Sequence, residues 1–374
     1  MRIAINTRFL LTNKLEGFGW YSYEICKRLV ESHPEHTFIF FFDRPYDSQF
    51  VFGDNVIPVV LKPAARHAFL FYYWFEFAVT KALTKYKADL FFSPDGYLSL
   101  GTKIPQIAVI HDINFAHFPE DLPKMAGKYL NYFFPKFALK AKKIITVSAY
   151  SKQDLVTTYG IESSKISVIW NGASDAFVPL SAQQKSDLKS KLTGGKDYFV
   201  FVGSLHPRKN VARLIEAYLL FKTNYPDGFD LVIVGENLWK NKGFNVPQTK
   251  LQSSIHFTGR LDLDSLTKVM GAASSLVYVP YFEGFGIPLV EAMKCGVPLI
   301  AGNKTSIPEV VGDAGILVDP YSVEEITDAL CRFYLDPSLQ KELSVKSLER
   351  GKLFSWDLAA QSVWNEIESL DQNQ

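Results

Sequence analysis

Short apolar runs alternate with longer segments of helical periodicity along the whole chain. Nearly every position in these runs is apolar, which is typical of parallel strands covered on both faces. We predict strands at residues 3–6, 37–42, 56–61, 90–93, 106–110, 143–147 and 166–170, then at 198–203, 229–235, 254–259, 276–279 and 298–301. This alternation predicts an α/β fold of two doubly wound, Rossmann-like domains that face each other across a cleft.

The pattern also indicates where the domains divide. The chain has 374 residues, enough for two domains. Residues 173–196 are polar and separate the two series of strands. We therefore expect an N-terminal domain at 1–172 and a C-terminal domain at 173–355. Residues 356–374 contain apolar positions at helical spacing with no strand after them, and we expect a helix that packs back across both domains.

Residues 277–296 combine an apolar strand, a glycine loop and a helix. Apolar residues spaced three apart predict the helix, which begins at Ile287. Free N–H groups at such a helix start favour an anion. Two carboxylates flank this place, Glu283 in the loop and Glu291 in the helix. The arrangement suits a sugar nucleotide, in which hydroxyl groups lie on either side of the phosphates. The plain alternative is an α/β connection with two solvated glutamates.

Other polar residues follow strand ends, where ligands bind in open α/β sheets. Ser204, Arg208 and Lys209 lie between a strand and a helix, and two cations at a helix N-terminus favour a diphosphate. His111 and Asp112 directly follow a strand of the first half. A surface charge pair and a structural histidine are the alternatives at these two places.

Gly17 and Gly19 lie in a loop that we expect to precede a helix from about residue 20. A dinucleotide fingerprint needs three glycines in a tighter turn. We therefore disfavour a nicotinamide-dependent dehydrogenase and favour a loop that closes over a substrate.

Charge is unevenly placed, although the net charge is only +1. Residues 1–170 contain 20 Lys and Arg against 15 Asp and Glu, and the remainder 20 against 24. Residues 122–153 contain seven lysines interleaved with aromatic residues and no acid, and residues 67–86 are strongly aromatic. Such stretches suit an anionic membrane surface. A solvated basic face and a core helix are the alternatives, and nucleic acid is disfavoured because no binding motif accompanies the charge.

Composition narrows the class of protein. The chain is globular, with 47% hydrophobic residues, and its three cysteines give neither a disulfide framework nor a metal cluster. No apolar run reaches the roughly 18 residues of a transmembrane helix, and a strand-like segment follows Met1-Arg2 in place of a secretory signal. We expect a cytoplasmic protein, either free or peripheral on the inner face of the membrane.

Six motifs in order resemble those of one family. They are Gly17-Phe18-Gly19, Ile110-His111-Asp112, Thr146-Val-Ser148 with Ser151-Lys152, residues 168–172, residues 202–210 and residues 283–292. The chain resembles a retaining GT-B glycosyltransferase of family 4, also called group 1. Within that family it resembles the bacterial mannosyltransferase-like branch that builds surface polysaccharides. The likeness covers nearly the whole chain, and Glu283 and Glu291 occupy the two ends of the family's carboxylate pair.

The resemblance implies a role for each motif. Glu291 would bind ribose hydroxyls of a nucleoside-diphosphate sugar, and Glu283 would bind hydroxyls of the sugar. Arg208 and Lys209 would neutralise the diphosphate leaving group, and His111 would stand over the reacting sugar. Further donor contacts would come from Gly17, Gly19, Ser204, Arg260, Leu261, Gly284, Phe285, Gly286 and Ile287.

The resemblance also implies the reaction. A hexose, mannose from GDP-mannose being favoured, would pass to a glycan or lipid-linked acceptor by front-face attack, without metal or further cofactor. Asp262 and Asp264 have the spacing of a metal-binding pair, but we expect Asp264 to be the N-cap of the next helix. Many relatives have arginine where this chain has Ser204, and we expect Arg208 and Lys209 to supply that charge.

Two other functions fit the same motifs. A nucleotide-sugar binding protein without transfer activity would bind the donor and release no nucleoside diphosphate. An epimerase or phosphorylase of the GT-B fold would interconvert the free donor, or release a sugar phosphate in the presence of phosphate.

Overall fold

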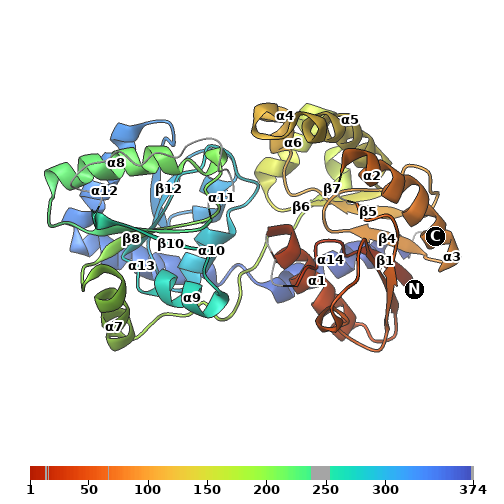
Figure 1. Ribbon diagram of the computed structural model, residues 1–374, viewed down its shortest axis with the longest axis horizontal. Coiled ribbons are helices and arrows are strands. Elements are labelled where there is room, and N and C mark those ends of the chain that lie inside the picture. Colours follow the sequence, from red (N-terminus) through yellow and green to blue (C-terminus); the bar gives the residue numbers. More distant parts are fainter. Residues whose placement is uncertain (13–14, 16, 66, 237–252, 372–374) are drawn as a thin grey trace. The chain divides into compact units, whose positions relative to one another are not determined.

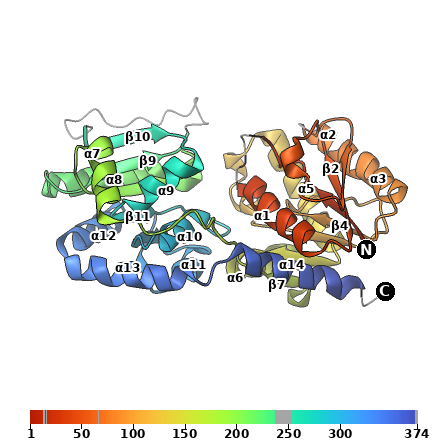
Figure 2. The same ribbon diagram turned by 90° about the horizontal axis from the view of Figure 1, so that it is seen from below.

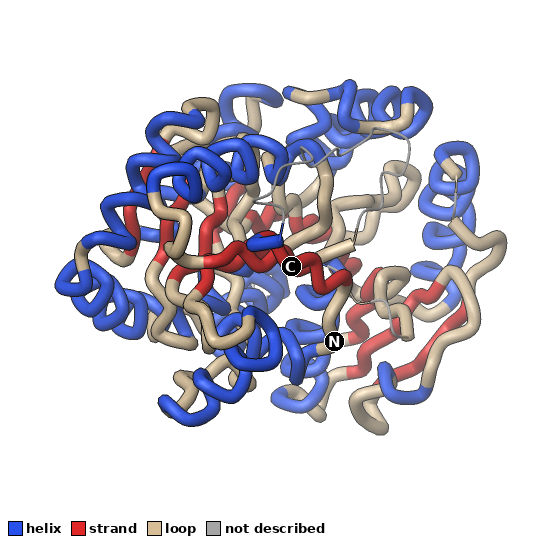
Figure 3. The backbone as a smooth tube through the Cα atoms, turned by 60° about the vertical axis from the view of Figure 1, so that its left-hand side comes forward, coloured by secondary structure: helices blue, strands red, loops and turns tan. Residues whose placement is uncertain are grey.

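The computed structural model describes residues 1–12, 15, 17–65, 67–236 and 253–371 (Figure 1). The chain divides into two compact units, Met1–Asn171 with Trp356–Gln374, and Gly172–Ser355. Each unit contains one parallel sheet with helices on both faces, as the strands and helices of Figures 2 and 3 also show. The predicted class, α/β with two doubly wound Rossmann-like domains, is confirmed.

The N-terminal unit has a seven-stranded sheet in the order β3-β2-β1-β4-β5-β6-β7. Its strands are β1 (Arg2–Asn6), β2 (Thr37–Phe42), β3 (Val56–Val60), β4 (Leu90–Ser93), β5 (Gln106–Val109), β6 (Lys143–Thr146) and β7 (Ile166–Val168). All neighbouring pairs are parallel. The order reverses between β1 and β4, and folds of this kind bind ligands at the carboxyl edge of the sheet beside such a reversal.

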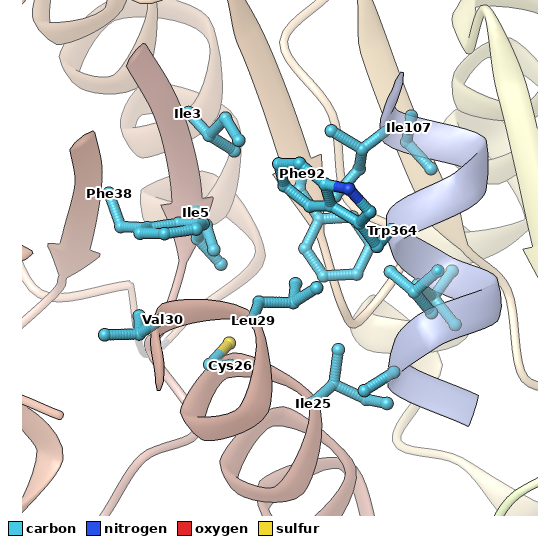
Figure 4. Close-up of a cluster of buried hydrophobic side chains, with 14 of the residues drawn as sticks. Ile3, Ile5, Ile25, Cys26, Leu29, Val30, Phe38, Phe92, Ile107 and Trp364 are labelled. Carbon is cyan, nitrogen blue, oxygen red and sulfur yellow. The ribbon is translucent and has the colours of Figure 1, made fainter. Parts of the chain in front are cut away.

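Successive residues of these strands point to opposite faces of the sheet and belong to two hydrophobic cores, one on each face. Ile3 and Ile5 point to the face covered by α1 (Gly17–Ser32) and α14 (Trp356–Asp371), and Figure 4 shows this core. Ala4 belongs to the core of the opposite face. That face is covered by α2 (Ala68–Tyr73), a π-helical turn η2 (Trp74–Val79), α3 (Thr80–Lys85), α5 (Lys124–Lys140) and α6 (Ala149–Tyr159). The strands are therefore buried on both faces, which explains their continuous apolar runs.

The C-terminal unit repeats the winding with the order β10-β9-β8-β11-β12-β13. Its strands are β8 (Tyr198–Val202), β9 (Asp230–Val234), β10 (Ile255–Gly259), β11 (Ser275–Tyr278), β12 (Leu299–Gly302) and β13 (Gly315–Val318). Its helices are α7 (Ala182–Thr193), α8 (Val211–Asn224), α9 (Leu263–Gly271), α10 (Ile287–Lys294), α11 (Ile307–Val311), α12 (Val323–Leu335) and α13 (Pro337–Gly351). The order reverses between β8 and β11, the strands that precede the predicted phosphate and carboxylate loops.

Short helical segments complete the described part of the chain. They are α4 (Asn114–His117) and the 3-10 turns η1 (Ser48–Phe50), η3 (Pro119–Asp121), η4 (Ser163–Lys165) and η5 (Pro207–Lys209).

Two sequence predictions are corrected. The N-cap of α9 is Asp262, whose carboxylate accepts the Ser265 N–H at 2.8 Å, while the predicted cap Asp264 lies inside the helix and pairs with Lys268. Helix α1 begins at Gly17, so Gly17 and Gly19 lie in its first turn and not in the preceding loop. The polar stretch at residues 173–196 begins where the second unit begins, and it contains α7, whose first turn is closed by a capping box between Ser181 and Gln184.

The last helix, α14, groups with the N-terminal unit. Its apolar residues Trp356, Ala359, Ala360, Val363, Trp364, Ile367 and Leu370 join the core beneath α1. The indole ring of Trp364 stacks on the imidazole of His33 with centroids 3.5 Å apart. This packing explains the amphipathic pattern of the segment.

Candidate active site

The predicted site residues of the C-terminal unit lie at the carboxyl ends of two neighbouring strands. Arg208 and Lys209 form η5 after β8, and Glu283 follows β11. The imidazole of His206 caps η5 by accepting the Arg208 N–H at 3.1 Å. The Arg208 carbonyl in turn accepts the Tyr281 N–H at 3.2 Å, which ties the two loops together. The sheet therefore brings together charged residues that are far apart in sequence.

Glu283 is the centre of a buried cluster of charges. Its carboxylate forms an ion pair with the Lys209 ammonium, and Arg208 Nη1 lies 3.1 Å from Glu283 Oε1. The hydroxyl of Tyr278 donates to the same carboxylate oxygen at 3.0 Å and accepts from Lys209 Nζ at 2.6 Å. Only 7% of Glu283 is exposed. Two cations thus surround one carboxylate, and the cluster has a net positive charge.

The surroundings fix the protonation states of this cluster. Burial alone would raise the pKa of Glu283, but Arg208 and Lys209 outweigh it, and the pKa lies below its ordinary value. Burial, followed by the negative charge of Glu283, raises the pKa of Tyr278 well above its ordinary value. Glu283 is therefore an anion and Tyr278 a neutral hydrogen-bond donor at neutral pH.

The backbone of the Glu283 loop is held from the next strand. Glu283 donates its N–H to Thr305 Oγ1 at 3.2 Å, and Ser306 Oγ donates to the Glu283 carbonyl at 2.9 Å. Both residues follow β12, the neighbour of β11. Gly286, the N-cap of α10, has φ +97°, and a Cβ there would meet Leu289 Cδ1 at 2.9 Å. Glycine is therefore needed at this start of a helix.

Glu291 lies one turn inside α10, and its surroundings differ from those of Glu283. Within the described ranges, no hydrogen bond or ion pair reaches its carboxylate, and burial raises the pKa of Glu291 to about 7. The group therefore changes charge near neutral pH. A carboxylate without a protein partner is free to accept hydrogen bonds from a ligand.

The other predicted residues of this unit lie in varied surroundings. Ser204 is half-buried and lies two residues after the end of β8. Arg260 and Leu261 follow β10 at the edge of the sheet, with β9 between them and β8. The side chain of Phe285 is buried against Phe354, so only its backbone is placed for a ligand contact. Gly284 and Ile287 flank the Gly286 cap of α10.

His111 lies in the N-terminal unit, two residues after the end of β5. Its Nε2 is 2.9 Å from the Pro94 carbonyl, and its ring contacts those of Phe18 and Tyr21 with centroids 4.9 and 4.7 Å apart. Burial lowers the pKa of His111, so the ring is neutral at pH 7. A carbonyl only accepts, hence Nε2 carries the proton and Nδ1 is an acceptor.

The Gly17-Phe18-Gly19 motif and His111 are brought together by this contact of Phe18. A Cβ at Gly19 would meet the Phe9 carbonyl at 2.9 Å, whereas one at Gly17 would meet nothing within 4 Å. Gly19 is therefore required by close packing, and Gly17 is not.

Several residues of the site were not predicted. Tyr278 lies in the apolar strand β11, so the sequence pattern indicated a core residue and not a hydroxyl group that binds Glu283 and Lys209. Thr305 and Ser306 follow β12, and the rule that ligands bind beyond strand ends could have indicated them. Asn210 holds φ +60° after η5 and donates its amide to the carbonyls of Val279 and Pro320.

Among the described residues, no group of three or more His, Cys, Asp or Glu side chains could hold a metal ion. No helix in the same ranges is both long and apolar enough to cross a bilayer.

Comparison with known proteins identifies the family. The model of the glycosyl transferases group 1 matches residues 182–350, and that of glycosyltransferase family 4 matches residues 15–177. The O-antigen chain mannosyltransferase B of Escherichia coli is 30% identical over 279 residues, which cover 74% of this chain and 73% of that protein.

Solved structures show the same fold. The sucrose-phosphate synthase of Thermosynechococcus elongatus has a TM-score of 0.79 at 18% identity over 100% of both chains. HepE of Anabaena, solved in complex with UDP, has a TM-score of 0.77 at 18% identity over 98% of this chain and 99% of its own. The protein therefore belongs to the group 1 glycosyltransferases of family 4, in their mannosyltransferase-like branch, and has the GT-B fold of two Rossmann-like domains.

Proposed function

We propose that the protein transfers mannose, with retention of configuration, from GDP-mannose to a glycan or lipid-linked glycan acceptor in surface polysaccharide synthesis. The observation that carries this proposal is the cluster of Arg208, Lys209 and Glu283 at the switch point of the second sheet. Its net positive charge suits a diphosphate, and its carboxylate suits sugar hydroxyls. The similarity to an O-antigen mannosyltransferase supports mannose, and the UDP complex of HepE supports a nucleoside-diphosphate donor.

The cluster suggests how the leaving group is stabilised. As the bond to the sugar breaks, negative charge grows on the diphosphate, and preorganised cations lower the energy of that state. Lys209 and Arg208 are held in place by Glu283 and Tyr278 before the donor binds. A diphosphate would share these cations with Glu283, so little reorganisation is needed at the moment of transfer. The acceptor hydroxyl would lose its proton to the departing phosphate oxygen, without a metal or cofactor.

Glu291 and His111 would bind neutral parts of the substrates. The partner-free carboxylate of Glu291 suits ribose hydroxyls, and the neutral ring of His111 suits a sugar hydroxyl. The edge loop with Arg260 and Leu261 would contact the base. Strand spacing places β10 about 10 Å from β8, a separation that matches a base lying apart from its phosphates.

A binding panel followed by a transfer assay tests the proposal. GDP-mannose should raise the thermal unfolding midpoint more than other sugar nucleotides, because a ligand of the folded state stabilises it by mass action. With a glycan acceptor, GDP should then be released. Binding without GDP release under any acceptor would favour a silent binding protein. Release of mannose 1-phosphate with added phosphate would favour a phosphorylase, and interconversion of the free donor an epimerase.

We also propose that the N-terminal unit contacts an anionic membrane. Exposed apolar residues gather on α2, η2 and α5, and they are Phe69, Tyr72, Tyr73, Phe77, Met125 and Tyr132. The rings of Tyr72 and Phe133 lie 5.7 Å apart, which makes the two helical segments neighbours. The Lys136 ammonium lies 3.3 Å from the Tyr132 ring centroid. Aromatic rings and lysines on one surface suit anionic lipid headgroups.

Vesicle flotation tests this contact. The protein should float with vesicles containing phosphatidylglycerol and not with vesicles of phosphatidylcholine alone. Phe69→Ser with Phe77→Ser should abolish flotation, while a matched change of exposed leucines in the other unit, Leu220→Ser with Leu353→Ser, should not. No flotation of the unmodified protein at low salt would refute the contact.

A further inference from the structure

Asp95 is the centre of a buried polar network at the switch point of the first sheet. Its Oδ1 accepts hydrogen bonds from Asn6 Nδ2 at 2.7 Å, Ser93 Oγ at 2.9 Å and the Tyr97 N–H at 3.3 Å. Its Oδ2 accepts from Arg8 Nε at 2.7 Å. Asn6 ends β1 and Ser93 ends β4, the two strands between which the order reverses. The carboxylate thus ties the loop after one strand to the end of its neighbour.

Arg8 is enclosed in this network and is itself withdrawn from solvent. Its guanidinium lies over four aromatic rings, at 4.8 Å from the centroid of Phe9, 5.0 Å from Phe71, 5.4 Å from Phe75 and 4.2 Å from Tyr97. The side chains of Arg8 and Asp95 are 5% and 2% exposed. Because both side chains are buried, a ligand cannot contact them directly. Arg8 and Asp95 can therefore influence a ligand only by positioning the residues to which they are bonded.

The residue held most directly is Pro94, between Ser93 and Asp95. The Gly96 N–H closes the turn on the Ser93 carbonyl at 3.3 Å, and Gly96 has φ +82°. The carbonyl of Pro94 accepts the hydrogen bond from His111 Nε2 at 2.9 Å. The position of this carbonyl is therefore set on both sides by groups bonded to the Asp95 carboxylate.

We propose that Asp95 is a positioning residue for His111: it fixes the Pro94 carbonyl, which selects the Nε2–H tautomer and leaves Nδ1 as a hydrogen-bond acceptor. An acceptor nitrogen pairs with a hydroxyl group and not with a phosphate or carboxylate oxygen. His111 then recognises a sugar hydroxyl, and this last step rests on the proposed function. The tautomer itself does not depend on that function.

Nitrogen-15 NMR of the histidine rings in the full chain tests the proposal, with His111 assigned from the signals lost in His111→Gln. The unmodified protein should show a protonated Nε2 and an unprotonated Nδ1 for His111. Asp95→Asn places an amide donor against either Arg8 or the Asn6 and Ser93 donors, so the turn should shift. We expect averaged ring shifts that report both tautomers, a kcat lower by about two- to tenfold as the population of the Nε2–H tautomer falls, and a donor Kd within about twofold of normal.

Asp43→Asn is the matched control. Asp43 is also a buried carboxylate of this unit, and it pairs with Arg44 and accepts the Ala65 N–H, but it has no bond to the turn of Pro94. It should lower the unfolding midpoint without changing the His111 signals. If Asp95→Asn does not fold, Ser93→Ala removes one bond to Asp95 and should give a smaller change of the same kind.

Three results would overturn the proposal. They are an Nδ1–H tautomer in the unmodified protein, unchanged ring signals in a folded Asp95→Asn, and normal kcat in a variant whose tautomer is mixed. If no sugar transfer is found even for the unmodified protein, the proposed function fails, yet the ring signals still decide whether Asp95 selects the tautomer.

Discussion

Glu283 and Glu291 lie eight residues apart in one motif, yet their surroundings displace their pKa values in opposite directions. Burial raises the pKa of both, but Glu283 has Arg208 and Lys209 beside it and ends below its ordinary pKa. Glu291 has no such partner among the described residues, and its pKa rises to about 7. Carboxylates whose pKa values are pushed apart in one site serve different tasks. Glu283 is an anion at neutral pH, whereas Glu291 changes charge near pH 7.

Donor binding should therefore release a proton near neutral pH. If ribose hydroxyls bind the ionised form of Glu291, the donor competes with the proton, and its affinity should fall about tenfold from pH 8 to pH 6. Calorimetric titrations with GDP-mannose at pH 6.5, in buffers of different ionisation enthalpy, measure this release. Glu291→Gln should bind more weakly with no proton release, and the same release in that variant would exclude Glu291 as its source.

The same carboxylate predicts a pH-dependent stability. A folded-state pKa of about 7 lies above the ordinary 4.5, so folding favours the protonated form, and this contribution is lost as pH rises through 7. Glu291→Gln removes the titration. The free energy of unfolding of the variant relative to the unmodified protein should rise from pH 5 to pH 8, by at most about 3 kcal/mol. Urea unfolding at both pH values measures it, and parallel curves would contradict the raised pKa.

Gly17 and Gly286 belong to two motifs but should respond differently to alanine. Gly286→Ala should destabilise the fold by about 1–3 kcal/mol, because φ +97° is strained for alanine and its Cβ would meet Leu289 at 2.9 Å. Gly17 lies in the first turn of α1, and a Cβ added there would meet no atom within 4 Å. Gly17→Ala should therefore leave the free energy of unfolding unchanged or raise it by about 0.5–1 kcal/mol. Thermal unfolding checks both. A loss of transfer in a stable Gly17→Ala would support closure of this segment over the donor.

The fold was largely predictable because the strands are buried on both faces and therefore form continuous apolar runs. Each element that was not predicted has a physical reason. Strand β13 (Gly315–Val318) is a half-exposed edge strand of four residues, too short and mixed to stand out. Helix α7 packs with few buried residues, so its polar sequence resembled a linker, and only its capping box indicated a helix. The π-helical turn η2 interrupts a segment whose sequence contains neither proline nor glycine, and no local signal predicts it.

The sequence indicated which residues lie at the site, but it did not indicate which of them contact one another. Strand ends and motifs indicated Arg208, Lys209 and Glu283, since carboxyl ends of adjacent parallel strands meet at one edge. That Lys209 and Glu283, 74 residues apart, pair with each other depends on the register of β8 and β11, which no local pattern contains. Asp95 was hidden because an acidic residue after a strand resembles an ordinary turn, and its burial follows only from the aromatic residues folded over Arg8.

The pairing of Lys209 with Glu283 predicts strong energetic coupling. Lys209→Met leaves a buried carboxylate with one cation fewer, and Glu283→Gln leaves two buried cations without their anion, so each should cost about 3–5 kcal/mol of unfolding free energy. The double variant should lose less than the sum, by about 2 kcal/mol or more, because Lys209 and Glu283 are removed together and only Arg208 is left without its anion. Urea unfolding of the four proteins measures this coupling.

The exposed pair Lys268 and Asp264, with Nζ and Oδ2 2.6 Å apart in α9, is the matched control, and its coupling should be about 0.5 kcal/mol or less. Equal coupling in the two pairs would mean that Glu283 and Lys209 are solvated, and the preorganised cation site would then lose its physical basis.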